Sequence, residues 1–333
     1  LKTAISVGLG LFIALIGLID SKVVRQGGTP LELGLGGSLQ GWPTLVFMFG
    51  LFLTLILMVR KVRGAILIGI LSSTVLAVIV EAVANLGAFD AEKNKTGWSL
   101  TVPHLNGSPF ALPSFETLGK FSLLGSIDKV GIVSVVLLVF TLLLADFFDT
   151  MGTMIAVGAE GDLLDSEGNP PKTREILVVD SLAAIAGGVG GVSSNTSYLE
   201  SATGVGEGAR TGLASVVTGC LFFLSMFIAP LVGMVPYEAA TPALVIVGFL
   251  MMTQVAEIDW TDLEIAIPSF LTIAMMPFSY SITNGIGAGF LSYVVLAVAR
   301  GKVKQIHPLM WLTAVLFLVY FTLAPIKAIL GVS

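Results

Sequence analysis

The sequence predicts an all-α protein that crosses a membrane many times, and two observations carry this prediction. Hydrophobic residues make up 55% of the 333 residues and charged residues only 12%, about half the charged share of a typical soluble domain. The hydrophobic residues also gather in long runs, several of which approach or exceed the ~20 residues that a helix needs to cross hydrocarbon. The net charge of −5 is spread over the loops, which argues against a nucleic-acid partner.

Ten apolar runs, bounded by polar residues, glycine or proline, predict helical spans. They cover residues 3–19, 43–59, 64–85, 131–158, 175–191, 211–235, 241–256, 263–280, 282–299 and 308–330. The last run is broken by Pro325, and the sequence leaves open whether it crosses the membrane or lies along the interface. The basic clusters RKVR at 60–63 and ARGKVK at 299–304 predict cytoplasmic loops. With residues 193–210 counted as one further crossing, an even number of spans lies between the two clusters, and the long connection 86–130 then lies outside the cell.

Catalytic and metal-binding chemistry is not indicated by the sequence. The single Cys220 lies in an apolar run without a partner for a disulfide, and His104 and His307 lie in polar loops away from other metal-ligating residues. A membrane enzyme would need a nucleophile with its base or a cluster of metal ligands, and the sequence contains neither pattern. We therefore expect a transporter with no cofactor and no metal, and not an enzyme.

Two carboxylates lie inside an apolar run, in the stretch LLLADFFDTMGTM at 142–154. Asp146 and Asp149 are three residues apart and therefore share one face of a helix, and Thr150 and Thr153 continue that polar stripe. A charge at the bilayer centre costs at least ~2.5 kcal/mol. An ion pair with another span is the structural alternative, but the expected spans contain essentially no interior Lys or Arg. The stripe therefore predicts a functional site that faces protein or a cavity.

A second polar segment follows, GGVGGVSSNTSYLESATGVGEGARTG at 187–212. Its glycines and the alternation through Thr196 and Tyr198 predict extended backbone that leads into a short helix, with Glu200 at the helix start and Arg210 closing its end. Extended backbone at membrane depth is tolerated where it is buried in protein or lines a cavity. Free N–H groups at such a helix start favour anionic or hydrogen-bond-accepting groups, and broken helices of this kind form substrate sites in secondary transporters. A glycine-rich turn capped by Glu200 is the structural alternative.

Together, the two segments resemble those of a known transporter family. FFDTMGT in one span, followed about fifty residues later by TSYLESATGVGEGARTG, resembles the AzgA-like purine permeases of the nucleobase/ascorbate transporter superfamily. KVRGAILIGIL at 61–71 and IPSFLTIAMMPFSYSITNGIG at 267–287 are also similar to that family. The likeness covers essentially the whole chain.

The resemblance implies an architecture and an activity. It implies fourteen spans in two inverted repeats of seven, divided into a core and a gate domain, with one broken helix preceded by a short extended segment. Residues 1–85 would form gate-domain spans of the first repeat, 86–130 the extracellular or periplasmic connection, 131–235 the core-domain spans with the substrate site, and 236–333 the gate-domain spans of the second repeat. The implied activity is uptake of hypoxanthine, guanine or adenine by symport with protons, with Na⁺ left open as the coupling ion. The implied protein is a multi-pass permease of the bacterial inner membrane that forms a homodimer.

The resemblance also implies which residues form the site. Asp146 and Asp149 match the two aspartates of the family's eighth span, and Glu200 matches the acidic position that starts its broken tenth span. All three are associated with purine binding in that family, and we expect them to couple binding to protons. The flat face of a purine can lie against an aromatic side chain near these carboxylates. The expected substrate-binding residues are Asp146, Asp149, Glu200, Phe147, Phe148, Tyr198, Thr196 and Ser201.

The sequence departs from the family pattern in one respect. The family's first four spans have no counterpart here, because Leu1 matches the start of the fifth span. The broken third span, which supplies part of the purine site, is then missing, and we expect these 333 residues alone not to transport purines. Two alternatives therefore stay open: a transporter of anions or of other nucleobases such as uracil or xanthine on the same fold, and a non-transporting truncated remnant. The acidic site residues disfavour an anion as the substrate.

Overall fold

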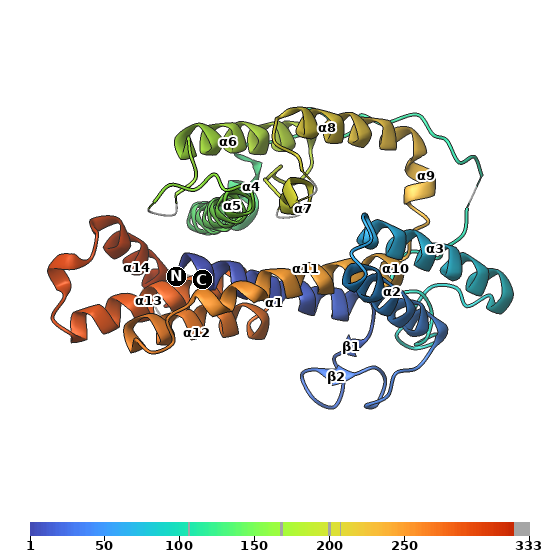
Figure 1. Cartoon of the computed structure of the whole chain (residues 1–333), viewed down its shortest axis with the longest axis horizontal. Helices are drawn as coiled ribbons and strands as arrows, with labels where there is room; N and C mark the ends of the chain where they lie inside the picture. The colour runs from blue at the N-terminus through green and yellow to red at the C-terminus, as the bar shows by residue number, and fades with distance from the viewer. Residues whose placement is uncertain (106, 167–168, 199–200, 207, 323–333) are drawn as a thin grey trace. The chain divides into compact units, whose positions relative to one another are not determined.

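The computed structural model describes residues 1–105, 107–166, 169–198, 201–206 and 208–322, which are mainly helical (Figure 1). The longer helices are α1 (Lys2–Asp20), α2 (Trp42–Val59), α3 (Ala65–Ala84), α5 (Ile132–Glu160), α6 (Thr173–Gly190), α8 (Leu213–Ser225), α11 (Pro242–Met252), α12 (Leu263–Phe278), α13 (Ile282–Ala299) and α14 (Pro308–Phe321). The shorter helical segments are α4 (Gly125–Val130), α7 (Ser201–Gly206), α9 (Ala229–Val232), α10 (Tyr237–Ala240), and the 3₁₀ turns η1 (Met226–Ile228), η2 (Thr253–Glu257) and η3 (Val303–Gln305).

Within the described residues, six helical segments are long and apolar enough to cross a membrane. They are Thr3–Asp20, Trp42–Val59, Ala65–Ala84, Leu213–Val232, Tyr237–Glu257 and Ile282–Ala299. α12 and α14 are apolar but shorter, whereas the 29 residues of α5 extend ~43 Å, more than the ~30 Å of hydrocarbon. Each of the ten expected runs is helical over most of its described residues, so the expectation of a polytopic helical protein is confirmed. The run expected at 308–330 is described only to residue 322.

A small β-hairpin, which the sequence did not predict, is added to the helices. β1 (Val24–Arg25) pairs antiparallel with β2 (Glu32–Leu33), with Val24 opposite Leu33 and Arg25 opposite Glu32. Each strand has two residues, too few to show the alternation by which a strand is recognised in a sequence. The hairpin follows α1 closely, and Lys22, two residues after the end of the helix, lies in the left-handed region with φ 59°.

Contacts between residues divide the chain into two compact units. The first unit comprises Leu1–Leu11, Phe115–Arg210 and Met251–Ser333, and the second comprises Phe12–Ser114 and Thr211–Leu250. In the second unit α2 and α3 pack against each other and against α10. Its buried core includes Val46, Ala77, Trp98 and Ala239. Trp98 comes from the long connection, and its indole Nε1 donates to Glu81 of α3 at 2.8 Å, so this part of the connection is folded onto the helices. The division into gate and core segments stays a prediction.

In the first unit, α12 and α13 pack closely along each other. Small residues make this approach possible, because a Cβ added at Gly289 of α13 would lie 1.9 Å from the Thr272 hydroxyl of α12. Glycine at helix contacts is typical of membrane proteins, where close backbone packing replaces the hydrophobic effect between helices.

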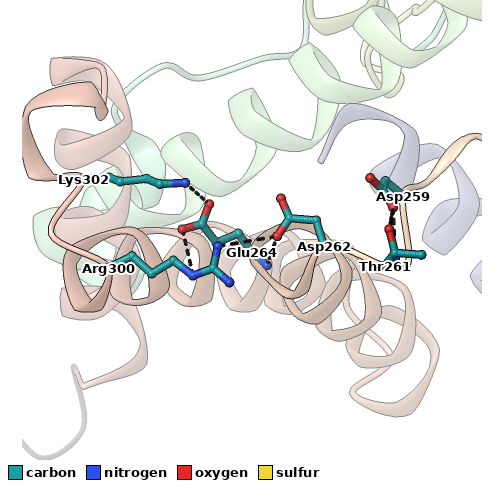
Figure 2. A network of polar contacts seen from close by, with 6 residues as sticks. All are labelled: Asp259, Thr261, Asp262, Glu264, Arg300 and Lys302. Carbon is teal, nitrogen blue, oxygen red and sulfur yellow. Dashed lines mark hydrogen bonds and ion pairs between the residues drawn. The ribbon is translucent and has the colours of Figure 1, made fainter.

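Charged residues tie the start of α12 to the end of α13 (Figure 2). Asp262 caps α12 by accepting the Glu264 amide at 3.0 Å. The Glu264 carboxylate pairs with Arg300 Nε at 3.3 Å and with Lys302 Nζ at 2.6 Å. Before the cap, hydrogen bonds from Thr261 hold the pKa of Asp259 below its usual value. The network therefore joins the N-terminal end of α12 to the C-terminal end of α13.

Candidate functional site

The two expected aspartates lie on α5, one turn apart, and both are half-buried. The hydroxyl of Ser194 donates to Asp146 Oδ1 at 2.9 Å. Because Ser194 belongs to the polar stretch that follows α6, this bond joins the two segments singled out in the sequence. The prediction that the stripe on α5 faces protein is supported by this contact.

A chain of hydrogen bonds runs beside these aspartates and connects three segments. Thr150 of α5 is fully buried, and Asp180 of α6 is only 8% exposed. The Thr150 hydroxyl donates to Asp180 Oδ2 at 2.9 Å and lies 2.8 Å from the hydroxyl of Thr196. A threonine hydroxyl has one hydrogen, and Thr150 gives it to Asp180, so Thr196 must be the donor to Thr150. The Thr196 oxygen then keeps lone pairs with which it can accept a hydrogen bond from a ligand.

The segment that carries Ser194 and Thr196 is held close to α6. That helix ends at Gly191, with φ 70°, and the chain then turns back along the helix. A Cβ added at Gly187 would lie 2.4 Å from the carbonyl oxygen of Ser193, and the Asn195 side chain donates to the Ala183 carbonyl at 3.1 Å. Glycine at position 187 is therefore what allows the backbone of residues 193–198 to approach the helix; we name these residues the extended segment, after the conformation expected from the sequence.

The short helix α7 follows the extended segment and packs against α5. Arg210 donates to the carbonyl oxygens of Val205 (2.5 Å) and Ala209 (2.8 Å), so it closes the end of this half-helix as expected. Residues 193–198, which form neither helix nor strand, are followed by the short helix α7 and the closing Arg210, and this order agrees with the helix break predicted from the sequence, whereas the extended backbone stays a prediction. Such an arrangement leaves irregular backbone where it can line a site.

The other expected site residues differ in how the structure places them. Phe147 is 41% exposed and Tyr198 is 67% exposed, and Ser201, at the start of α7, is also exposed. Phe148 lies in α5, but its side chain is outside the described part of the chain, as is the whole of Glu200. The structure therefore brings Asp146 and Thr196 into one hydrogen-bonded region, with Asp149 on the same helix face.

Comparison with known proteins places this chain in a family. The model of the permease family matches residues 2–323. The chain belongs to the permease family. It is 38% identical over 319 residues to adenine permease AdeP of Escherichia coli (strain K12), a match that covers 96% of this chain and 66% of AdeP. It is 36% identical over 321 residues to guanine/hypoxanthine permease PbuG of Bacillus subtilis (strain 168), covering 96% of this chain and 68% of PbuG.

Family membership confirms several expectations from the sequence. This permease is a multi-pass protein of the plasma membrane, a transporter and not an enzyme. A further relative, nucleobase transporter PlAzg2 of Paenibacillus larvae, is 33% identical over 295 residues, or 89% of this chain and 54% of the relative. The permease spans about two thirds of the length of the first two relatives. The resemblance to purine permeases is thereby confirmed.

Sequence reasoning gave too little weight to Thr150 and Asp180 of this permease. In the sequence, Asp180 lies one or two turns inside an apolar run, and support of the site and an ion pair with Lys172 or Arg174 are equally good expectations for it. In the described residues its carboxylate instead accepts the Thr150 hydroxyl. The signal available in the sequence was a buried acidic residue one or two turns inside a span, which in membranes is a functional candidate by default.

Proposed function

We propose that this permease takes up purine nucleobases, with hypoxanthine, guanine or adenine as substrate, in symport with protons. The observation that supports this most is the set of hydrogen-bond acceptors gathered between α5 and the extended segment: Asp146, bonded to Ser194, and Thr196, oriented by Thr150 and Asp180. A purine presents ring and exocyclic N–H donors in one plane, and carboxylate and hydroxyl oxygens are suitable acceptors for them. The names of the relatives, which are adenine and guanine/hypoxanthine permeases, support the same substrate class.

The residues have separate roles in this proposal. Asp146, Asp149 and Glu200 accept N–H groups of the base and carry the coupled proton. The aromatic rings of Phe147, Phe148 and Tyr198 lie against its flat face, which is apolar and suited to stacking. Thr196 and Ser201 complete the polar contacts.

Proton coupling follows from the chemistry of a carboxylate in such a site. A carboxylate in a site of low dielectric near other carboxylates tends to hold a proton, whereas N–H donors from a bound base favour the charged form of the group that they contact. With several carboxyl groups in the site, one holds the proton while another accepts the base, so that proton and base are bound together, as symport requires. Sodium ions are the alternative coupling ion, and uptake measured with each gradient in turn separates the two.

The proposed architecture is that of an inverted-repeat transporter. α7 and the extended segment before it form the broken helix of one repeat, which in such transporters meets its counterpart near the bilayer midplane. Core-domain spans would carry this site and gate-domain spans would surround it, and two copies would form a homodimer.

Competition of uptake tests the substrate class. Uptake of radiolabelled hypoxanthine is measured in cells that express the full-length protein, with an excess of adenine, guanine, xanthine or uracil present. We expect adenine or guanine to compete and uracil not to compete, and a protonophore to abolish accumulation. Competition by uracil or xanthine but not by adenine or guanine would favour a transporter of other nucleobases. Absence of any uptake by a folded, membrane-inserted protein would favour a non-transporting remnant.

A further inference from the structure

A cavity with a basic lining lies in the second unit, just beyond the end of α1. Its volume is about 750 Å³, and its walls come from the β-hairpin and from the connection after α3. The lining includes Lys22, Arg25, Lys95, Phe89 and Glu32. The candidate span in α1 ends at Asp20, so Lys22 lies at the boundary between hydrocarbon and water, where lipid headgroups lie. None of the described residues of the proposed purine site lines this cavity.

Three cations reach this cavity from two segments that are 70 residues apart in sequence. Lys22 Nζ lies 4.9 Å, and Arg25 Cζ 5.5 Å, from the centre of the same Phe89 ring. The Arg25 guanidinium is fixed by the backbone, because it donates to the carbonyl oxygens of Lys22 (2.9 Å) and Lys95 (2.8 Å). Two positive charges beside one ring repel each other, and an anion seated between them would relieve this repulsion.

The nearby carboxylates act on these charges only at longer range, Glu238 on Lys22 and Arg25 and Asp20 on Lys22. In the part of the chain that the structure describes, none of the three cations forms a salt bridge. Glu32 lines the cavity, and its two oxygens accept the backbone amides of Gly28 in the hairpin loop and of Gly36 after β2, each at 3.3 Å. Burial lowers the pKa of Arg25, and the charge of Glu238 offsets part of that shift, yet a guanidinium stays protonated at physiological pH. A partly desolvated cation that no carboxylate contacts directly gains from an added anion.

From this geometry we infer that the cavity binds a phosphate ester. Phosphate oxygens accept several charge-assisted hydrogen bonds at once, and arginine with lysine is the usual combination that holds them. The cavity is much larger than a phosphate group, so it has room for the organic part of an ester, and the Phe89 ring gives that part an apolar wall. A lipid headgroup and a soluble organic phosphate both carry this chemistry, and binding measurements distinguish the two sources.

The test uses the purified protein in a detergent with an uncharged headgroup. Isothermal titration with glycerol 3-phosphate measures the soluble ester, and titration with dihexanoyl phosphatidylglycerol measures the lipid, with dihexanoyl phosphatidylcholine as the uncharged-headgroup comparison. We expect Lys22→Gln to weaken binding about tenfold or more, the loss of one charge-assisted hydrogen bond, and Lys22→Arg to restore it. Lys95→Gln is a second variant, at an exposed side chain where folding is not at risk.

Lys93→Gln is the matched control, because Lys93 is exposed in the same connection but does not line the cavity. It should bind like the wild type, and thermal unfolding should show all variants folded. Binding of both ligands supports a site for soluble phosphate esters, and binding of the anionic lipid alone supports a headgroup site. If neither ligand binds, or if the wild type, Lys22→Gln and Lys95→Gln bind equally well, the inference is overturned.

Discussion

Replacing Gly187 by alanine should displace the extended segment that carries Ser194 and Thr196. The added Cβ would lie 2.4 Å from the Ser193 carbonyl oxygen, and contacts shorter than 3.0 Å essentially do not occur for real Cβ atoms. The neighbour is backbone, so it cannot rotate away as a side chain can. The segment must therefore move away from α6 by about 0.6 Å or more, the difference between these two distances.

Such a shift acts on the two hydrogen bonds that hold the segment to α5. Ser194 lies 2.9 Å from Asp146, and Thr196 lies 2.8 Å from Thr150. A rigid displacement of about 0.6 Å along these bonds lengthens them to about 3.4–3.5 Å, where hydrogen bonds have largely lost their strength. Loss of one such hydrogen bond costs about 1–3 kcal/mol. If the segment binds the purine, this corresponds to a dissociation constant for the purine that is about 5- to 150-fold larger.

The assay is binding of radiolabelled hypoxanthine to the purified protein, and the chain offers a matched control. A Cβ added at the neighbouring Gly188 meets no atom within 4 Å. Gly188→Ala should therefore bind hypoxanthine like the wild type, and it should be as stable or more stable, because alanine favours a helix interior by about 0.5–1 kcal/mol over glycine. If Gly187→Ala and Gly188→Ala bind hypoxanthine equally well, the close approach at Gly187 does not position the site.

Three further substitutions test the proposed roles of single residues. Thr150→Val keeps the shape of the side chain but removes the donor to Asp180, so the affinity for purine should fall about tenfold and the free energy of unfolding by about 1–3 kcal/mol. Thr150→Ser should restore both. Unchanged affinity and unfolding in the valine variant would contradict the chain of hydroxyl hydrogen bonds. Asp146→Asn and Asp149→Asn should each reduce uptake, with an altered pH dependence at the residue that carries the proton, and wild-type profiles in both would make these residues structural. Glu200→Gln should strongly reduce purine binding in a protein that still unfolds cooperatively, whereas an unchanged affinity would remove Glu200 from the site.

The helices could be predicted from the sequence because the membrane imposes a simple rule. Apolar runs of sufficient length must be helical, since a helix satisfies all of its backbone hydrogen bonds within itself. The break before α7 could also be predicted, because a stretch of glycine and polar residues between apolar runs is tolerated at membrane depth only where it is buried in protein or lines a cavity. The hairpin of β1 and β2 escaped prediction because two residues per strand leave no periodic pattern.

The contacts within the site were harder to predict than its segments. Asp146 and Asp149 share a face through helix periodicity, which depends only on sequence spacing. The chain from Asp180 through Thr150 to Thr196 depends on how α5, α6 and the extended segment pack, and residues 30 and 46 positions apart carry no local signal of that contact. Gly187 is similar, because its role is visible only when the carbonyl that approaches it is known.

A structure of the protein with bound hypoxanthine tests the central claim most directly. The claim is that acceptors on α5 and on the extended segment together form the purine site. The account predicts that the base lies between them, with one N–H group about 2.7–3.2 Å from a carboxylate oxygen of Asp146 or Asp149 and another at that distance from the Thr196 hydroxyl. A base that is bound elsewhere and contacts neither α5 nor the segment 193–198 would contradict the account.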